Sequence, residues 1–288
     1  LADTLWRKEA ATNNPDTTQS DRARTQLQHM VRGIKREEDK DRIWVEVQES
    51  LGDFEWTRQQ GRNWGSAWQY YQQALDWWAG AKDLELARTR YINIIWTITS
   101  PPWRDRYYIY ANYGNQVPLN FLENALKIAK TPTDKHRAQY LIAMSLRNQG
   151  GWNQIKKVGQ AFESSLKEGK QSDWYDDALY HYAEWLAHQG EVVVLKGGQK
   201  KRQQNYVKAL RYYRRILNKF KKGETRYYKD AKRKIQQITK PALTASVSNI
   251  FLPGSETQVQ VNWRNLKRVD FNLFQVDLTE DVKPEGNQ

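Results

Sequence analysis

Three residues of one predicted helix carry side chains that can bind a metal ion. His181, Glu184 and His188 lie at positions i, i+3 and i+7, so they share one face of a helix over 173–189. Imidazole nitrogens and a carboxylate are typical zinc ligands. The two histidines, however, stand about 10 Å apart along the helix axis, which strains a shared coordination sphere. We therefore expect packed or exposed histidines here rather than a metal site.

Other motifs that carry chemistry are missing from the sequence. The chain has no cysteine and four histidines, which excludes disulfide scaffolds and thiolate chemistry and disfavours a His-rich metal centre. Gly197 and Gly198 stand among lysines but lack the P-loop pattern, so they indicate a loop. Asp176 and Asp177 lie at a helix start, where they can stabilise the helix dipole. We predict a protein that is not an enzyme, without catalytic, cofactor-binding or metal-binding residues.

Positive charge is concentrated in one segment. The net charge is +13, and residues 200–240 hold sixteen lysines and arginines against Glu224 and Asp230. Such a cluster can contact nucleic acid, anionic lipid or an acidic protein surface, or it can simply be the solvated face of a helix. We expect its members to face solvent on two adjacent helices as a candidate partner-binding surface. They are Lys208, Arg211, Arg215, Lys219, Lys222, Lys229, Lys232 and Arg233.

Tryptophan and tyrosine are abundant, with 13 and 16 residues. Tryptophans at helical spacing favour packing between helices over stacking on nucleic-acid bases. This group comprises Trp44, Trp68, Trp174 and Trp185. A less periodic group follows the prolines that end a helix near residue 100, and it forms a second candidate partner-binding set. Its members are Trp103, Tyr107, Tyr108 and Tyr110.

The elements that position these residues are mainly helices. Apolar residues recur at helical spacing between glycine and proline breaks. The predicted helices are 18–37, 39–60, 64–80, 83–98, 103–112, 118–130, 133–149, 152–168, 173–189, 204–221 and 225–239. After Pro241 the period changes to two, which predicts strands over 244–250, 257–263 and 269–273. The domain boundary is expected near residue 240, and no apolar run approaches the ~18 residues of a transmembrane segment.

Two of the predicted helices share an internal repeat. The string AWQYYQQAL (67–75) matches ALRYYRRIL (209–217). Ala183 and Ala209 are small residues at which two helices can approach closely, and Gly190 ends a helix. A helix pair cannot bury its apolar stripe alone, so such pairs stack into a solenoid. Residues 191–204 interrupt this pattern and are expected to form a projecting loop or short hairpin.

The repeat pattern resembles degenerate tetratricopeptide repeats (TPR), most closely over 174–217. The matching positions are Ala183, Gly190, Tyr206, Ala209 and Tyr213. The resemblance implies a mainly α fold, in which residues 1–240 form a TPR-like α-solenoid of antiparallel helix pairs. A short antiparallel β module, residues 241–288, follows this solenoid.

The β segment resembles a second family. IFLPGSETQVQVNWRNLKRVDFNLFQVDL (250–278) is similar to the opening of a macroglobulin-type β-sandwich domain in bacterial alpha-macroglobulin-like proteins. The shared features are Pro253-Gly254, the acidic Glu256, and strands that end in Arg264-Asn265 and Val276-Asp277. These proteins trap proteases, and some large members carry helical repeats before their first such domain. The resemblance implies that 241–288 is a partial sandwich that continues in a longer chain.

Two functions of different classes follow from these patterns. The resemblance implies a non-catalytic protein–protein interaction scaffold, the N-terminal region of a larger protease-inhibiting protein that is periplasmic or secreted. Its partner would be another protein or the remainder of its own longer chain. The alternative is binding of nucleic acid or another anionic polymer through the basic patch 200–240.

Overall fold

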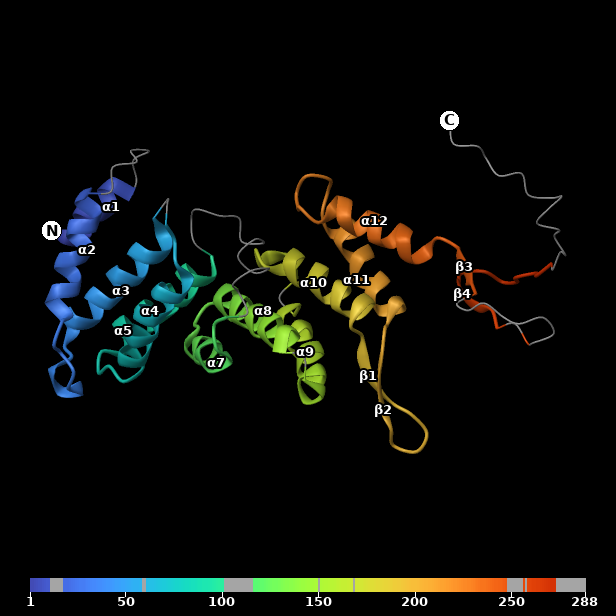
Figure 1. Cartoon of the computed structure of the whole chain (residues 1–288), viewed down its shortest axis with the longest axis horizontal. Helices are drawn as coiled ribbons and strands as arrows, with labels where there is room; N and C mark the ends of the chain where they lie inside the picture. Colours follow the sequence, from blue (N-terminus) through green and yellow to red (C-terminus); the bar gives the residue numbers. More distant parts are fainter. Residues whose placement is uncertain are drawn as a thin grey trace. The chain divides into compact units, whose positions relative to one another are not determined.

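The computed structural model describes residues 1–10, 18–58, 61–100, 116–149, 151–167, 169–247, 256 and 258–272 (Figure 1). The chain divides into two compact units, Leu1–Ala231 and Lys232–Gln288. The described residues are mainly helical and include two small antiparallel sheets, as predicted. None of the described helices is both long enough and apolar enough to cross a membrane.

The first unit is built from helices that pack on their neighbours in chain order. The helices are α1 (Ala2–Ala10), α2 (Thr18–Val31), α3 (Arg42–Thr57), α4 (Trp64–Ala79), α5 (Leu84–Thr99), α7 (Leu119–Ile128), α8 (Pro132–Gln149), α9 (Trp152–Ser165), α10 (Tyr175–His188) and α11 (Tyr206–Lys219). Short 3-10 turns, η1 (Glu37–Asp39) and η2 (Gly169–Gln171), precede α3 and α10. The most extensive contacts join α1 to α2, α3 to α4, α8 to α9 and α10 to α11.

Asparagine and aspartate side chains mark where several helices begin. Asp41 accepts a hydrogen bond from the backbone N–H of Trp44 at 2.8 Å, and Asn205 accepts one from Lys208 at 2.9 Å. Asn63 and Asp83 cap α4 and α5 in the same way. These contacts satisfy backbone donors that have no partner within the helix, so they stabilise the first turn of each of these helices.

The N-terminal helix α1 was not predicted from the sequence. Its Trp6 is buried and packs edge-on against Phe54 of α3, with 5.7 Å between the ring centroids. The predicted helix over 18–37 ends earlier, at Val31, because Gly33 has a φ of +93°. The helix predicted over 103–112 lies outside the described residues.

Equivalent positions of the sequence repeat are buried to the same degree. Ala67 and Tyr71 of α4 and Ala209 and Tyr213 of α11 all have an exposed fraction of 0%. Ala183 of α10 is also fully buried, and α10 packs on α11. The predicted burial of the small residues in this helix pair is therefore confirmed.

The predicted packing role of the periodic tryptophans is also confirmed. Trp44, Trp174 and Trp185 are buried. Trp68 is half-buried and packs edge-on against Phe121 of α7, with 5.2 Å between centroids.

Gly52 allows α3 and α4 to approach closely. A Cβ atom at this position would lie 2.6 Å from two ring carbons of Tyr71. The Tyr71 ring cannot move aside easily, because it is fully buried and its hydroxyl donates to Asp53 Oδ1 at 2.7 Å.

We expect Gly52→Ala to lower the free energy of unfolding by about 1–3 kcal/mol, because the added methyl group overpacks this contact. Alanine is intrinsically the better helix former, so the loss identifies packing as the cause. Gly159→Ala on α9 is the matched control, since its Cβ would make an ordinary contact of 3.5 Å with Tyr182 Oη. Urea unfolding should show no loss for the control, and an equally stable Gly52→Ala variant would disprove the close approach.

The segment between α10 and α11 is a β-hairpin, which is one of the two structures predicted for 191–204, a loop or a short hairpin. Strand β1 (Glu191–Val194) pairs antiparallel with β2 (Lys200–Gln203). Gly197 and Gly198 have φ values of +97° and +81° in the connecting turn. Strand β1 also packs on α9.

The second unit contains most of α12 (Tyr228–Thr239); the first residues of this helix belong to the first unit. The second unit also contains a two-stranded antiparallel sheet, formed by β3 (Ala242–Ser246) and β4 (Gln260–Arg264). Asn265 donates to the carbonyl oxygen of Ile238 at 2.7 Å, and Arg264 donates to that of Gln237 at 2.6 Å. These bonds attach the end of β4 to the end of α12, close to the predicted boundary at residue 240. Of the predicted third strand, 269–272 lie outside any strand, and Leu273 is not among the described residues.

Candidate functional site

The predicted basic surface is divided between the two units. Arg211, Lys219, Lys222 and Lys229 are exposed in the first unit. Lys232 and Arg233 are exposed in the second. The second candidate set, Trp103, Tyr107, Tyr108 and Tyr110, lies outside the described residues.

Two of the predicted surface cations do not face solvent freely. The Lys208 side chain is 25% exposed, and its Nζ lies 2.7 Å from Glu191 Oε1 and 2.9 Å from Glu163 Oε1. Arg215 is half-buried over the ring of Tyr175, 5.2 Å from the centroid. The prediction was wrong here because helical periodicity cannot show that a hairpin and neighbouring helices cover these positions.

A groove lies between the hairpin and helices α9 and α10. It has a volume of about 730 Å³. Its buried lining includes Ile155, Tyr182 and Trp185, whereas Lys156 and Lys200 are exposed at its edge. An apolar floor with a basic edge is suited to a ligand that carries both apolar and acidic groups.

One end of this groove is closed by a polar network around Lys208. Tyr182 donates to Glu163 Oε1 at 2.9 Å, and Asn205 donates to Glu191 Oε2 at 2.9 Å. Burial alone lowers the pKa of Lys208, but hydrogen bonds with Glu191, Tyr182 and Glu163 outweigh it and raise this pKa. The ammonium group of Lys208 therefore makes its ion pairs within the protein, and these pairs attach the hairpin to α9 and α11.

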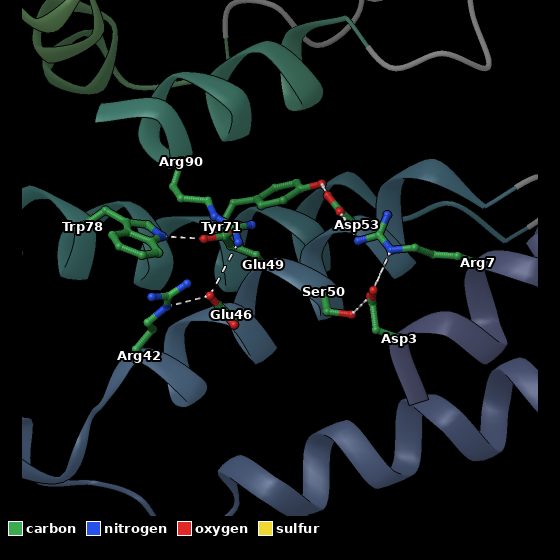
Figure 2. Close-up of polar contacts among 10 residues, drawn as sticks. All are labelled: Asp3, Arg7, Arg42, Glu46, Glu49, Ser50, Asp53, Tyr71, Trp78 and Arg90. Atoms are coloured by element: carbon green, nitrogen blue, oxygen red, sulfur yellow. Dashed lines mark hydrogen bonds and ion pairs between the residues drawn. The ribbon is translucent and has the colours of Figure 1, made fainter. Parts of the chain in front are cut away.

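A second polar cluster lines one face of α3 (Figure 2). At one end, Arg7 of α1 pairs with Asp3 at 2.9 Å and with Asp53 at 2.6 Å, and Ser50 donates to Asp3. Tyr71 of α4 donates to the other oxygen of Asp53. These contacts join α1, α3 and α4 through side chains that are only partly exposed.

The other end of the α3 cluster is centred on Glu49. Arg90 of α5 lies 3.1 Å from Glu49 Oε2, and Trp78 of α4 donates to Glu49 Oε1. Arg90 and Arg42 also pair with Glu46. Burial raises the pKa of Glu49 to about 7, even though the Trp78 hydrogen bond and the Arg90 charge lower it. The cluster has the character of an internal cross-link between α3, α4 and α5.

The three residues considered for metal binding, His181, Glu184 and His188, do not come together as one site in the structure. His181 is buried and lies 3.8 Å from Glu184, but Arg147 of α8 contacts both side chains, at 3.4 Å and 3.1 Å. Burial lowers the pKa of His181. Burial raises the pKa of Glu184, but the His181 hydrogen bond and the Arg147 charge outweigh this and lower it to about 2. His188 is exposed at the end of α10. The described residues contain no group of three acidic, His or Cys side chains that could hold a metal ion.

Comparison of the chain with protein-family models, with curated proteins and with solved structures gives no match. The groove beside β1, the exposed basic residues and the small C-terminal sheet are thus the features from which a function can be inferred. Sequence reasoning missed the groove, although the interruption of the repeat at 191–204 marked its location.

Proposed function

We propose that this chain is a non-catalytic protein-interaction scaffold, which forms the N-terminal region of a larger alpha-macroglobulin-like protein. Its helices are proposed to stack as a TPR-like solenoid of antiparallel pairs. The larger protein would trap proteases in the periplasm or outside the cell. The resemblance of 250–278 to a macroglobulin-type domain supports this assignment.

The observation that carries the proposal is the apolar face of the β3–β4 sheet. Leu243 pairs with Trp263 and Ala245 pairs with Val261, so all four side chains lie on one face. Leu243 and Trp263 are 48% and 63% exposed. The opposite face carries mostly polar residues, including Thr244. A sheet with one apolar face needs a covering layer, and in a β-sandwich a second sheet supplies it.

Contacts between helices that are not neighbours in the chain support the stacked arrangement. Beside the α1–α3 and α3–α5 contacts described above, Trp96 of α5 donates to Asp134 of α8 at 3.1 Å. Arg147 of α8 in turn pairs with Glu184 of α10. Stacked helix pairs require contacts of this kind, because each pair buries its apolar stripe against the next one.

The alternative, binding of nucleic acid through 200–240, has weaker support. Exposed Arg211, Lys219 and Lys222 provide positive charge. Binding of single strands also needs exposed aromatic rings on which bases stack. Tyr213 and Tyr227 are buried, with exposed fractions of 0% and 2%, and the other tyrosines of this segment, Tyr206, Tyr212 and Tyr228, are half-buried.

The complete coding sequence of the gene tests the larger assignment. We expect further macroglobulin-type sandwich domains after residue 288 and a secretory signal peptide before the helical part. A reading frame without any such domain would refute membership of an alpha-macroglobulin-like protein, and the scaffold role would then rest on the helical part alone.

A further inference from the structure

We propose that the groove between β1 and α9 binds an extended acidic polypeptide segment, which adds to β1 as a third strand of the hairpin. The inference rests on the proposed scaffold function and specifies the chemistry of the partner. It is argued from the position of the groove, the backbone of β1 and the charge around it.

The groove lies beside β1 along its whole length and also reaches Lys200 of β2, the partner of Val194. Glu191, Val192, Val193 and Val194 all line it. Successive side chains of a strand point to opposite faces of its sheet. A cavity that touches four consecutive residues therefore lies beside the strand, where the backbone is accessible.

The hydrogen-bond register leaves this edge unpaired. The backbone N–H of Leu195 donates to the carbonyl oxygen of Gln199 at 2.8 Å, which makes these two residues a hydrogen-bonded pair. Such pairs alternate with non-bonded ones in an antiparallel ladder, so the backbone groups of Val192 and Val194 point away from β2. Within the part of the chain that the structure describes, no group hydrogen-bonds to them.

An unpaired edge next to a groove is a template for strand addition. Alternate side chains of an added strand would point toward the two sides of the widened sheet. The buried Ile155 and Trp185 provide an apolar surface for one set. Gly159 of α9 has no side chain there and leaves room for the incoming segment.

The charge around the groove selects an acidic segment. Two exposed lysines line the groove, Lys156 on α9 and Lys200 on β2. The two carboxylates of the lining, Glu163 and Glu191, are both paired with Lys208. The lining therefore holds three lysines against two glutamates, and this net charge of +1 favours glutamate or aspartate in the occupant.

The probes are two short fluorescein-labelled peptides, in which valine alternates either with glutamate or with lysine. Binding to the full chain is followed by fluorescence anisotropy. We expect the glutamate peptide to bind at least about tenfold more tightly than the lysine peptide. Equal affinity for the two, or no binding of the glutamate peptide, would overturn the proposal.

Proline variants test whether the strand edge is used. Val194→Pro removes an N–H that points toward the groove and leaves the pairing with β2 intact. It should weaken binding of the glutamate peptide at least about tenfold. Arg202→Pro is the matched control, because its N–H points to the outer edge of β2, and it should retain affinity within about twofold. Equal effects of the two variants would contradict strand addition.

Charge reversal tests the basic edge separately. Lys156→Glu should weaken binding of the glutamate peptide, whereas Lys157→Glu, on the next exposed position of α9 and outside the groove lining, should change it far less. Equal weakening by both would show that only the net charge matters and would contradict a built site. Loss of peptide binding leaves the scaffold proposal standing, because that proposal is tested separately, by the coding sequence and by nucleic-acid binding at physiological salt.

Discussion

Gly190→Ala is expected to lower the free energy of unfolding by about 3 kcal/mol. Gly190 has a φ of +77°, a conformation that residues with a side chain rarely adopt. A Cβ atom here would overlap the carbonyl group of Gln203 and would lie 2.6 Å from the backbone nitrogen of Gln204. Because the obstacle is backbone, relief requires a shift of β2, which is paired with β1 and leads into α11.

Gly198→Ala separates the two causes of the lost stability, the strained positive φ and the steric overlap with backbone atoms. Gly198 has a similar φ of +81°, but no described heavy atom outside its own chain neighbours lies within 4 Å of the position that a Cβ would take. This variant should lose only the conformational part, about 1 kcal/mol. Urea unfolding monitored by tryptophan fluorescence provides the comparison. Equal losses for the two variants would show that the hairpin base does not pack against Gly190 as described.

Glu49 is expected to make the stability of the protein pH-dependent near neutrality. Its pKa is raised from 4.5 to about 7 by burial. Between these two pH values the folded state keeps the proton and the unfolded state has lost it. The unfolded state therefore binds fewer protons, and the free energy of unfolding falls with rising pH by up to about 3 kcal/mol over this window.

Glu49→Gln should remove this dependence. We expect the variant to be about 2 kcal/mol more stable than the wild type above pH 7 and to show no gain below pH 4.5, because the wild-type side chain is neutral there. Glu123→Gln, at an exposed position of α7 outside this cluster, is the control, and it should retain the wild-type pH dependence. Urea unfolding across this pH range checks both, and a Glu49→Gln variant with the wild-type slope would contradict the assignment.

The sequence predicts most of the helices because local signals determine where they start and stop. Helical spacing of apolar residues places α3 and α11 within a few residues of their observed positions, where Asp41 and Asn205 cap them. The repeat match likewise predicts the shared burial of Tyr71 and Tyr213. Helix α1 was missed because its burial depends mainly on Trp6, which packs against Phe54 far away in the sequence.

The candidate site could not be predicted to the same extent, because it depends on contacts between distant segments. Lys208 lies on the polar side of α11 in the sequence pattern, and only the fold of the hairpin brings Glu191 to it. Glu49 looks like an ordinary polar residue until α4 and α5 cover it with Trp78 and Arg90. The unpaired edge of Val194 follows from the register of β1 and β2, which the spacing of residues does not determine.

A salt titration of the full chain with a labelled single-stranded oligonucleotide tests most directly whether the protein is a scaffold for polypeptides. We expect weak binding that is lost by about 150 mM salt, because exposed cations such as Arg211 and Lys219 attract phosphate, whereas every aromatic residue of 200–240 is at least half-buried and offers little surface for stacking. Tight binding that persists near about 150 mM salt, with a log–log slope of about −0.7 per contacted phosphate, would contradict the scaffold role.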